Sequence, residues 1–212
     1  MNLFGSLKRR NNSLLLVYIL FFITVWANSI IGTTDMANWI IENTLTVLSL
    51  IFLFSTYQSF RFNSFSYLLL CLFLCMHVYG SKYSYAANPL GFYFQELFNS
   101  PRNQYDRVVH FSFGLLLFYP MWECFSKWKK YPKNIALFLP MLLVVFVGAI
   151  YEIIEWLVAD IFFTEQGISY LGTQGDIWDA QKDMAIAFAG VCIATLLFYF
   201  YSLSNGKLLN KN

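Results

Sequence analysis

Residues 135–158 read IALFLPMLLVVFVGAIYEIIEWLV, an apolar run with only two charged residues, Glu152 and Glu155. A helix needs roughly 20 mostly apolar residues to cross the hydrocarbon core of a bilayer, and this run is long enough. Burying a carboxylate at that depth is costly, so intramembrane acids are usually functional or paired with a partner. The run therefore predicts a membrane-spanning helix that carries part of a polar site.

The rest of the chain repeats this pattern. Of its 212 residues, 58% are hydrophobic, 20% are aromatic and only 12% are charged, which is too apolar for an ordinary soluble domain. Six stretches have the length and composition of a span, at approximately 14–31, 39–57, 64–80, 108–126, 135–159 and 184–203. We therefore expect an all-α, polytopic transmembrane bundle of about six spans, with residues 1–212 forming a single integral membrane domain.

The basic residues fall mainly on one side of a six-span arrangement. Ten lie on the side of the two termini: Lys8, Arg9, Arg10, Arg61, Lys127, Lys129, Lys130, Lys133, Lys207 and Lys211. Only four lie on the other side, namely Lys82, Arg102, Arg107 and Lys182. Because cytoplasmic loops of membrane proteins carry an excess of Lys and Arg, this bias predicts that both termini are cytoplasmic.

The acids have the opposite distribution, which points to a site on the outer side. Eight map to outer loops or outer helix ends: Asp35, Glu96, Asp106, Asp160, Glu165, Asp176, Asp179 and Asp183. Glu123, near the inner end of its span, is expected to pair with Lys127 four residues later. The basic turn at 127–133 lies between two spans, so we expect it to contact anionic headgroups of the lipid bilayer and no nucleic acid.

Three segments carry the candidate site. Asp106 and His110 are four residues apart at the start of one span, which places them on one helix face, and Gly114 is expected to keep that face open. Glu152 and Glu155 share a face about 8–12 Å below the outer boundary, at 1.5 Å per residue.

The third segment contains Asp176, Asp179 and Asp183. Asp176 is also a candidate to cap the N-terminus of the last span, as an alternative to a role in the site. Small residues continue the stripe at Ala187, Gly190 and Ala194. Such a stripe lets another helix approach closely, so Asp179 and Asp183 are expected to face the bundle interior.

Two kinds of chemistry fit these residues. Carboxylates with an imidazole suit a divalent ion such as Mg²⁺, Mn²⁺ or Zn²⁺, with His110, Glu152, Glu155 and Asp183 as candidate metal ligands. Without metal, a buried glutamate beside His110 forms a general acid–base pair. The candidate catalytic residues are Asp106, His110, Glu152, Glu155, Asp179 and Asp183. In the structural alternative, these acids only pair with neighbouring arginines, cap helices or hold helices together.

The same segments resemble a known family. Residues 102–111 (RNQYDRVVHF), 151–156 (YEIIEW) and 171–184 (LGTQGDIWDAQKDM) resemble the YjdF-like family of bacterial inner-membrane proteins. This resemblance covers nearly the whole chain and implies a multi-pass protein of the bacterial cytoplasmic (inner) membrane, but the family has no established activity to carry over. A looser likeness to VanZ-like membrane proteins rests on an acid and a His-Phe pair at one helix start, here with one additional residue between Asp106 and His110.

These observations leave three functions open. The first is an outward-facing polar site that acts on a lipid-linked or envelope substrate. The second is a small proton- or cation-coupled transporter, and the third is a non-catalytic membrane scaffold. The run from Met141 to Ile150 has no charged residue, which disfavours a transport path through that helix. No sequence pattern indicates the oligomeric state.

Overall fold

The computed structural model describes residues 3–33, 35–162 and 172–204, and these ranges contain helices and no strand. The elements are α1 (Leu3–Ile30), α2 (Met36–Thr56), α3 (Ser64–Lys82), α4 (Pro89–Leu97), α5 (Tyr105–Glu123), the π-helix η1 (Cys124–Trp128), α6 (Lys133–Phe162) and α8 (Asp179–Ser204). Six helices are long and apolar enough to cross a membrane, in the order predicted. The all-α, six-span prediction is therefore confirmed, while the side of each terminus stays a prediction.

The observed spans run slightly beyond the predicted ones at their polar ends. The span predicted at 108–126 extends over Tyr105–Trp128, and the one predicted at 184–203 extends over Asp179–Ser204. The added turns contain Asp106 and Arg107 on α5 and Asp179 and Asp183 on α8, because a helix continues past the apolar run that hydropathy detects. Glu165, Gly167, Lys207 and Lys211 lie outside the described residues.

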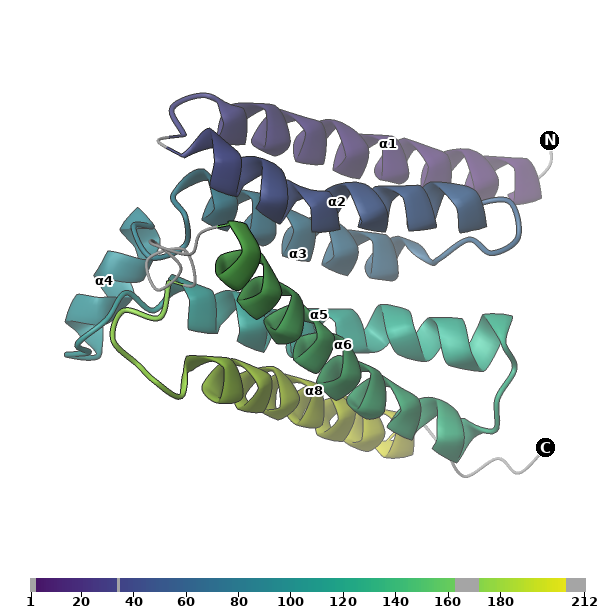
Figure 1. Ribbon diagram of the computed structural model, residues 1–212. Helices are drawn as coiled ribbons and strands as arrows, with labels where there is room; N and C mark the ends of the chain where they lie inside the picture. Colours follow the sequence, from purple (N-terminus) through teal and green to yellow (C-terminus); the bar gives the residue numbers. More distant parts are fainter. Residues whose placement is uncertain (1–2, 34, 163–171, 205–212) are drawn as a thin grey trace. The chain divides into compact units, whose positions relative to one another are not determined.

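The chain packs as two compact units, Met1–Ser84 and Tyr85–Asn212; the single domain stays a prediction. In the first unit, α3 packs against both α1 and α2 (Figure 1). Buried polar groups link the three helices: the Trp26 indole donates a hydrogen bond to Asn43 Oδ1 at 2.7 Å, and Asn43 Nδ2 donates to Ser81 Oγ at 3.0 Å. Asn43 therefore joins α1 and α3 from its place on α2.

In the second unit, α5 packs most extensively against α8, and α6 covers both (Figure 1). The apolar core of this unit contains Phe118, Val144, Ala187, Val191 and Ala194. The predicted small-residue stripe on α8 thus faces protein, as expected. This core lies next to the candidate site along the helices, so it fixes the frame in which the polar side chains meet.

Two glycines let α5 and α8 approach closely. A Cβ on Gly190 would meet the carbonyl oxygen of Phe111 and lie 3.0 Å from the Leu115 amide nitrogen. A Cβ on Gly114 would meet the carbonyl oxygen of Ala187 on α8. The prediction that Gly114 keeps an open face is therefore wrong: the α8 backbone fills the space that this glycine leaves.

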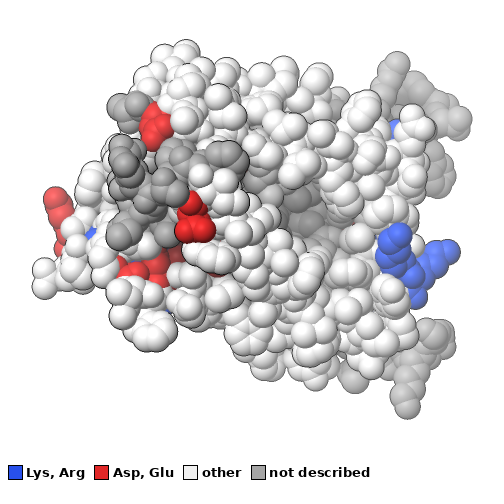
Figure 2. Space-filling model, in the orientation of Figure 1, with Lys and Arg blue, Asp and Glu red and all other residues white. Residues whose placement is uncertain are grey.

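The other end of this unit is basic. Pro120 lies in the last turns of α5, which continues into η1. The buried Glu123 carboxylate accepts a hydrogen bond from Lys127 Nζ at 2.8 Å, which confirms the predicted pair. Figure 2 shows acidic side chains toward one end of the drawn face and a basic patch toward the other.

Candidate functional site

Charged side chains of the second unit gather where α5 and α8 begin. The two helices run parallel, because Arg107 meets Asp183 near their starts and Gly114 meets Ala187 about two turns further along. Helix α6 runs in the opposite direction and brings Glu152 to His110 on α5. We call this group the polar cluster: Arg102, Asp106, Arg107, His110, Glu152, Asp176, Asp179, Lys182 and Asp183.

Arg107 lies at the centre of the polar cluster. Its guanidinium pairs with the Asp179 carboxylate, lies 2.5 Å from Asp183 Oδ1 and 3.3 Å from Asp176 Oδ2, and donates to the Asp179 carbonyl oxygen at 2.9 Å. Arginine suits this role because its planar fork of donors serves several acceptors at once. Arg107 thus binds the start of α5 to the start of α8 and to the loop before it.

A second buried arginine, Arg102, contacts two carboxylates of the cluster. One guanidinium nitrogen donates to Asp179 Oδ1, and another lies 3.6 Å from Asp106 Oδ2. The Asp179 side chain is therefore shared by two arginines. Removing either arginine would leave a buried carboxylate short of a partner, which is strongly destabilising in a low-dielectric site.

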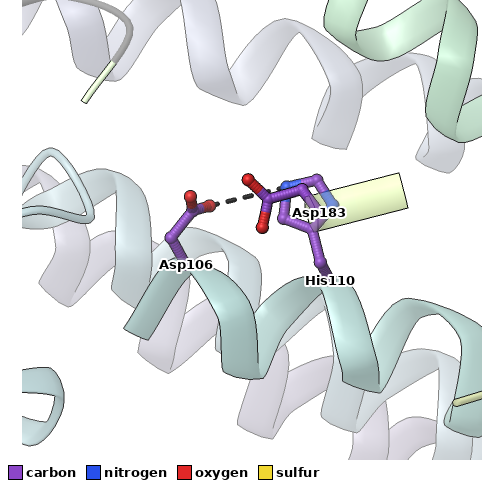
Figure 3. Close-up of side chains that lie close together, drawn as sticks. All are labelled: Asp106, His110 and Asp183. Atoms are coloured by element: carbon purple, nitrogen blue, oxygen red, sulfur yellow. Dashed lines mark ion pairs between the residues drawn. The ribbon is translucent and has the colours of Figure 1, made fainter. Parts of the chain in front are cut away.

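His110 lies between two carboxylates. Its Nε2 is 3.5 Å from Asp106 Oδ1, a pair drawn in Figure 3, and 3.8 Å from Glu152 Oε1. Both distances exceed that of an ordinary hydrogen bond, so the imidazole lies near both carboxylates without bonding directly to either. A small polar group, such as a water or a substrate hydroxyl, fits the chemistry of such a gap, because it can bridge groups that do not touch.

Glu152 is one of the costly groups of the site. Its side chain is only 11% exposed, and Oε1 is buried without a hydrogen-bond partner among the described residues. A buried acceptor without a donor costs about 1–3 kcal/mol, and more when it is charged. Glu155 is half-buried three residues further along α6. Glu155 does not belong to the group of potential metal ligands that lie close together, which consists of Asp106, His110 and Asp183.

The polar cluster has more negative than positive groups. Its five carboxylates face three fixed cations, an excess of two negative charges when all are ionised and His110 is neutral. Like charges held close together in a low-dielectric region repel each other strongly. The cluster therefore attracts an additional proton or cation.

Asp176 anchors the loop that precedes α8. The carboxylate accepts hydrogen bonds from Lys182 Nζ at 2.7 Å and from the Trp178 amide at 3.1 Å. The bond from Lys182 is the main reason that the Asp176 pKa lies below its usual value. Gly172 and Gly175 adopt positive φ angles of 62° and 87°, which side chains rarely tolerate.

A second set of contacts ties α4 to the cluster. The Asn103 amide donates to Gln174 Oε1 at 2.8 Å, and Asn103 Nδ2 donates to the Asn88 carbonyl oxygen at 2.8 Å. A Cβ on Gly91 would collide with the Asn103 side chain, so α4 packs directly on this residue. The exposed side of α4 and of its C-terminal end carries Leu90, Phe92, Tyr93, Leu97 and Phe98. The helix that carries this apolar face thus packs on Asn103, the residue next to Arg102 in the sequence.

Five of the six predicted catalytic candidates come together in the polar cluster: Asp106, His110, Glu152, Asp179 and Asp183. Sequence reasoning treated Arg102 and Arg107 as topology signals and as alternative partners of Asp106, and Arg102 does contact Asp106. It missed that both arginines pair with Asp179 on α8. One signal was available, since Arg107 precedes Gly114 by seven residues as Asp183 precedes Gly190. Seven residues are about two helical turns, so each charged residue lies on the same helix face as its glycine, and these are the glycines at which the two helices approach each other.

The fold and this cluster define a polytopic integral membrane protein with an ion-paired polar site at one end of a helix bundle. The chain belongs to the DUF2238 family of predicted membrane proteins, whose model matches residues 14–204. It is similar to the inner membrane protein YjdF of Escherichia coli (strain K12), at 32% identity over 170 residues, which cover 79% of this chain and 80% of that relative. No solved structure matches the chain.

These findings confirm the resemblance to the YjdF-like family and the localisation to the bacterial inner membrane. The likeness to VanZ-like proteins stays a prediction. The role of the polar cluster also lies beyond what the family description states, and it has to be argued from the geometry.

Proposed function

We propose that this inner-membrane protein uses the polar cluster as an outward-facing site that acts on a lipid-linked or envelope substrate. The observation that carries the proposal is the Glu152 carboxylate, buried opposite His110 without a hydrogen-bond donor on Oε1 among the described residues. Buried polar groups are normally satisfied, and unsatisfied ones at a polar site suggest a missing ligand or water. Glu152 and His110 are therefore the groups that would meet the substrate.

The chemistry of these residues supports acid–base work. His110 has a carboxylate on either side, Asp106 at 3.5 Å and Glu152 at 3.8 Å. An imidazole can take or give a proton near neutral pH, and a general base must lie within hydrogen-bond reach of the group it serves, directly or through one water. A hydroxyl group in this gap would meet both an imidazole and a carboxylate.

The distribution of charge favours a one-sided site over a transport path. Helix α8 has no charged residue from Met184 to Ser204, and α6 has none from Asn134 to Tyr151. The apolar core that includes Phe118 and Val191 occupies the same part of the unit. A proton or cation pathway would need polar groups at that depth. The transporter alternative therefore has less support.

The scaffold alternative is disfavoured by energetics. Buried ion pairs often stabilise a fold no better than apolar residues of similar size. A scaffold needs neither more carboxylates than cations in the polar cluster nor a buried carboxylate oxygen without a hydrogen-bond donor, as Glu152 Oε1 is among the described residues. A site that binds a cationic or hydroxyl-bearing ligand needs both features.

The apolar side of α4 supports a lipid-linked substrate. Aromatic and aliphatic side chains such as Phe92, Tyr93 and Leu97 are exposed there. Amphipathic helices with such faces lie in the membrane interface. Because α4 packs on Asn103, the residue that follows Arg102, a lipid in the interface beside α4 would have its headgroup close to the polar cluster.

The test is retention of a lipid by the purified protein. The parent, Glu152→Gln and His110→Ala would be purified in a mild detergent, and bound lipids identified by native mass spectrometry. Glu96→Gln, which makes the same change at an exposed position on α4, is the matched control. We expect a lipid species enriched over the bulk membrane in the parent and the control and lost in both site variants. An identical lipid complement in all four proteins would contradict the proposal.

Glu155→Gln shows whether the second glutamate belongs to the site. The sequence prediction has Glu155 acting with His110, in which case this variant also loses the lipid and the double variant with His110→Ala is no worse than either single one. Retention of the lipid by Glu155→Gln would remove Glu155 from the site and leave Glu152 as its acidic residue on α6.

A further inference from the structure

We propose that Asp106, His110 and Asp183 bind a divalent cation of the Mn²⁺ type within the polar cluster. One ligand atom from each residue lies within 4.8 Å of the other two (Figure 3). The inference rests on the proposed function, because it names the cofactor class of the same site. It also revises the predicted metal ligands by adding Asp106 and leaving out Glu155.

The distances suit an ion after small side-chain movements. Metal bonds of about 2.0–2.2 Å to nitrogen and oxygen place neighbouring ligand atoms about 3–3.5 Å apart. The pair of His110 Nε2 and Asp106 Oδ1 is already at 3.5 Å. Asp183 reaches the same position from α8, whose backbone is held against α5 at Gly114 and Gly190. The helix frame therefore sets the three donors before any ion arrives.

The charge of the polar cluster matches a divalent ion. When all acids are ionised and His110 is neutral, five carboxylates and three fixed cations leave an excess of two negative charges, which one divalent ion would neutralise. Asp183 is a fitting ligand although Arg107 contacts its Oδ1 at 2.5 Å, because a carboxylate has two oxygens and can serve both partners. An anion at this position is disfavoured, since the carboxylates of Asp106, Glu152 and Asp183 lie around His110.

Glu152 gives the inference a second, independent support. Its buried Oε1 lacks a donor among the described residues and lies 3.8 Å from His110 Nε2. A water bound to the ion would supply that donor, and metal sites regularly hold such waters through neighbouring carboxylates. Glu152 would then position the water, while the three other residues bind the ion.

The donor set indicates which ion fits. Carboxylates and water suit Mg²⁺, Ca²⁺ and Mn²⁺, whereas imidazole suits Zn²⁺ and other transition metals. Mn²⁺ accepts both kinds of ligand. It is also the cleaner probe, because Zn²⁺ would bind the free thiols of Cys71, Cys75, Cys124 and Cys192.

The experiment measures Mn²⁺ binding to the full chain. The protein would be purified in detergent, stripped with EDTA and titrated with Mn²⁺, with free ion followed by electron paramagnetic resonance. The parent should bind one equivalent, and His110→Ala and Asp106→Asn should each weaken binding at least tenfold. Asp160→Asn, at an exposed acid on α6, is the matched control and should bind as the parent does.

Folding and function are separated from ion binding in the same samples. The melting temperature without metal shows whether each variant is folded. If His110→Ala fails to fold, Asp106→Asn still tests the site, because it keeps the size of a half-buried side chain. A parent that binds less than a tenth of an equivalent, or site variants that bind as the parent does, would overturn the inference. If lipid retention still depended on His110 in that case, the proposed function would stand without the ion. If the protein bound one equivalent of Mn²⁺ but retained no lipid, the ion site would stand and the proposed function would be contradicted.

Discussion

Replacing Gly190 by alanine tests the helix contact on which the polar cluster depends. The added Cβ would meet the Phe111 carbonyl oxygen and lie 3.0 Å from the Leu115 amide nitrogen, below the roughly 3.4 Å at which ordinary contact begins. Both obstacles are backbone atoms of α5, which cannot rotate away as a side chain can. The two helices must therefore move apart, and the α5 and α8 groups of the polar cluster move with them.

The expected loss follows from two opposing effects. Overpacking a tight contact costs about 1–3 kcal/mol, with rigid backbone placing this case near the upper value. Alanine regains about 1 kcal/mol of helix propensity over glycine. The net loss of about 2 kcal/mol corresponds to a melting temperature about 4–8 °C lower for a chain of this size.

The assay is thermal unfolding in a mild detergent, followed by tryptophan fluorescence and circular dichroism. Gly148→Ala on α6 is the matched control, because its Cβ would lie 3.8 Å from the Met184 side chain, an ordinary contact. That control should melt at or slightly above the parent. The double variant Gly114→Ala/Gly190→Ala should lose less than the sum of the single losses, because one separation of the helices relieves both collisions. Equal melting of Gly190→Ala and Gly148→Ala would refute the close approach.

Three further changes test other parts of the structure. Arg107→Met should cost about 3–5 kcal/mol in unfolding free energy, because it leaves buried carboxylates unpaired. Lys182→Gln should cost less than about 1 kcal/mol, because the lysine side chain is 54% exposed. Equal losses in denaturant unfolding would contradict the central role of Arg107. Asn103→Ala should cost about 1–3 kcal/mol and speed proteolytic cleavage near α4, and an unchanged cleavage rate would show that α4 is held by other contacts. Reporter fusions after Lys130 should behave as cytoplasmic and those after Asn99 as external, and the reverse result would overturn the predicted orientation.

The spans were predictable because membrane crossing leaves a long, local signal. About 20 apolar residues in a row exclude most other structures, so all six spans were found within a few residues of their observed bounds. Helix periodicity also predicted that Asp106 and His110 share a face of α5, which their 3.5 Å separation confirms. Each of these features depends on residues close together in the chain.

The contacts between helices could not be obtained in this way. The hydrogen bond between the Asn103 amide and Gln174 joins residues 71 positions apart, and no local pattern pairs them. Periodicity places Gly114 on a face, but only the position of α8 shows that this face is filled by the Ala187 carbonyl oxygen. Arg107 likewise has the same local sequence whether it faces solvent or the carboxylate of Asp183.

Labelling of a cysteine at position 106 tests the central claim most directly, namely that the polar cluster opens to the outer side of the membrane. Asp106→Cys would be made in a chain whose four native cysteines are replaced by alanine, with Lys130→Cys as the opposite-side control. The Asp106 side chain is 22% exposed, so a thiol there is reachable. In intact cells, a membrane-impermeant maleimide should label Asp106→Cys and leave Lys130→Cys unlabelled until the membrane is opened. Labelling of Lys130→Cys in intact cells, with Asp106→Cys reached only in inverted vesicles, would contradict the claim.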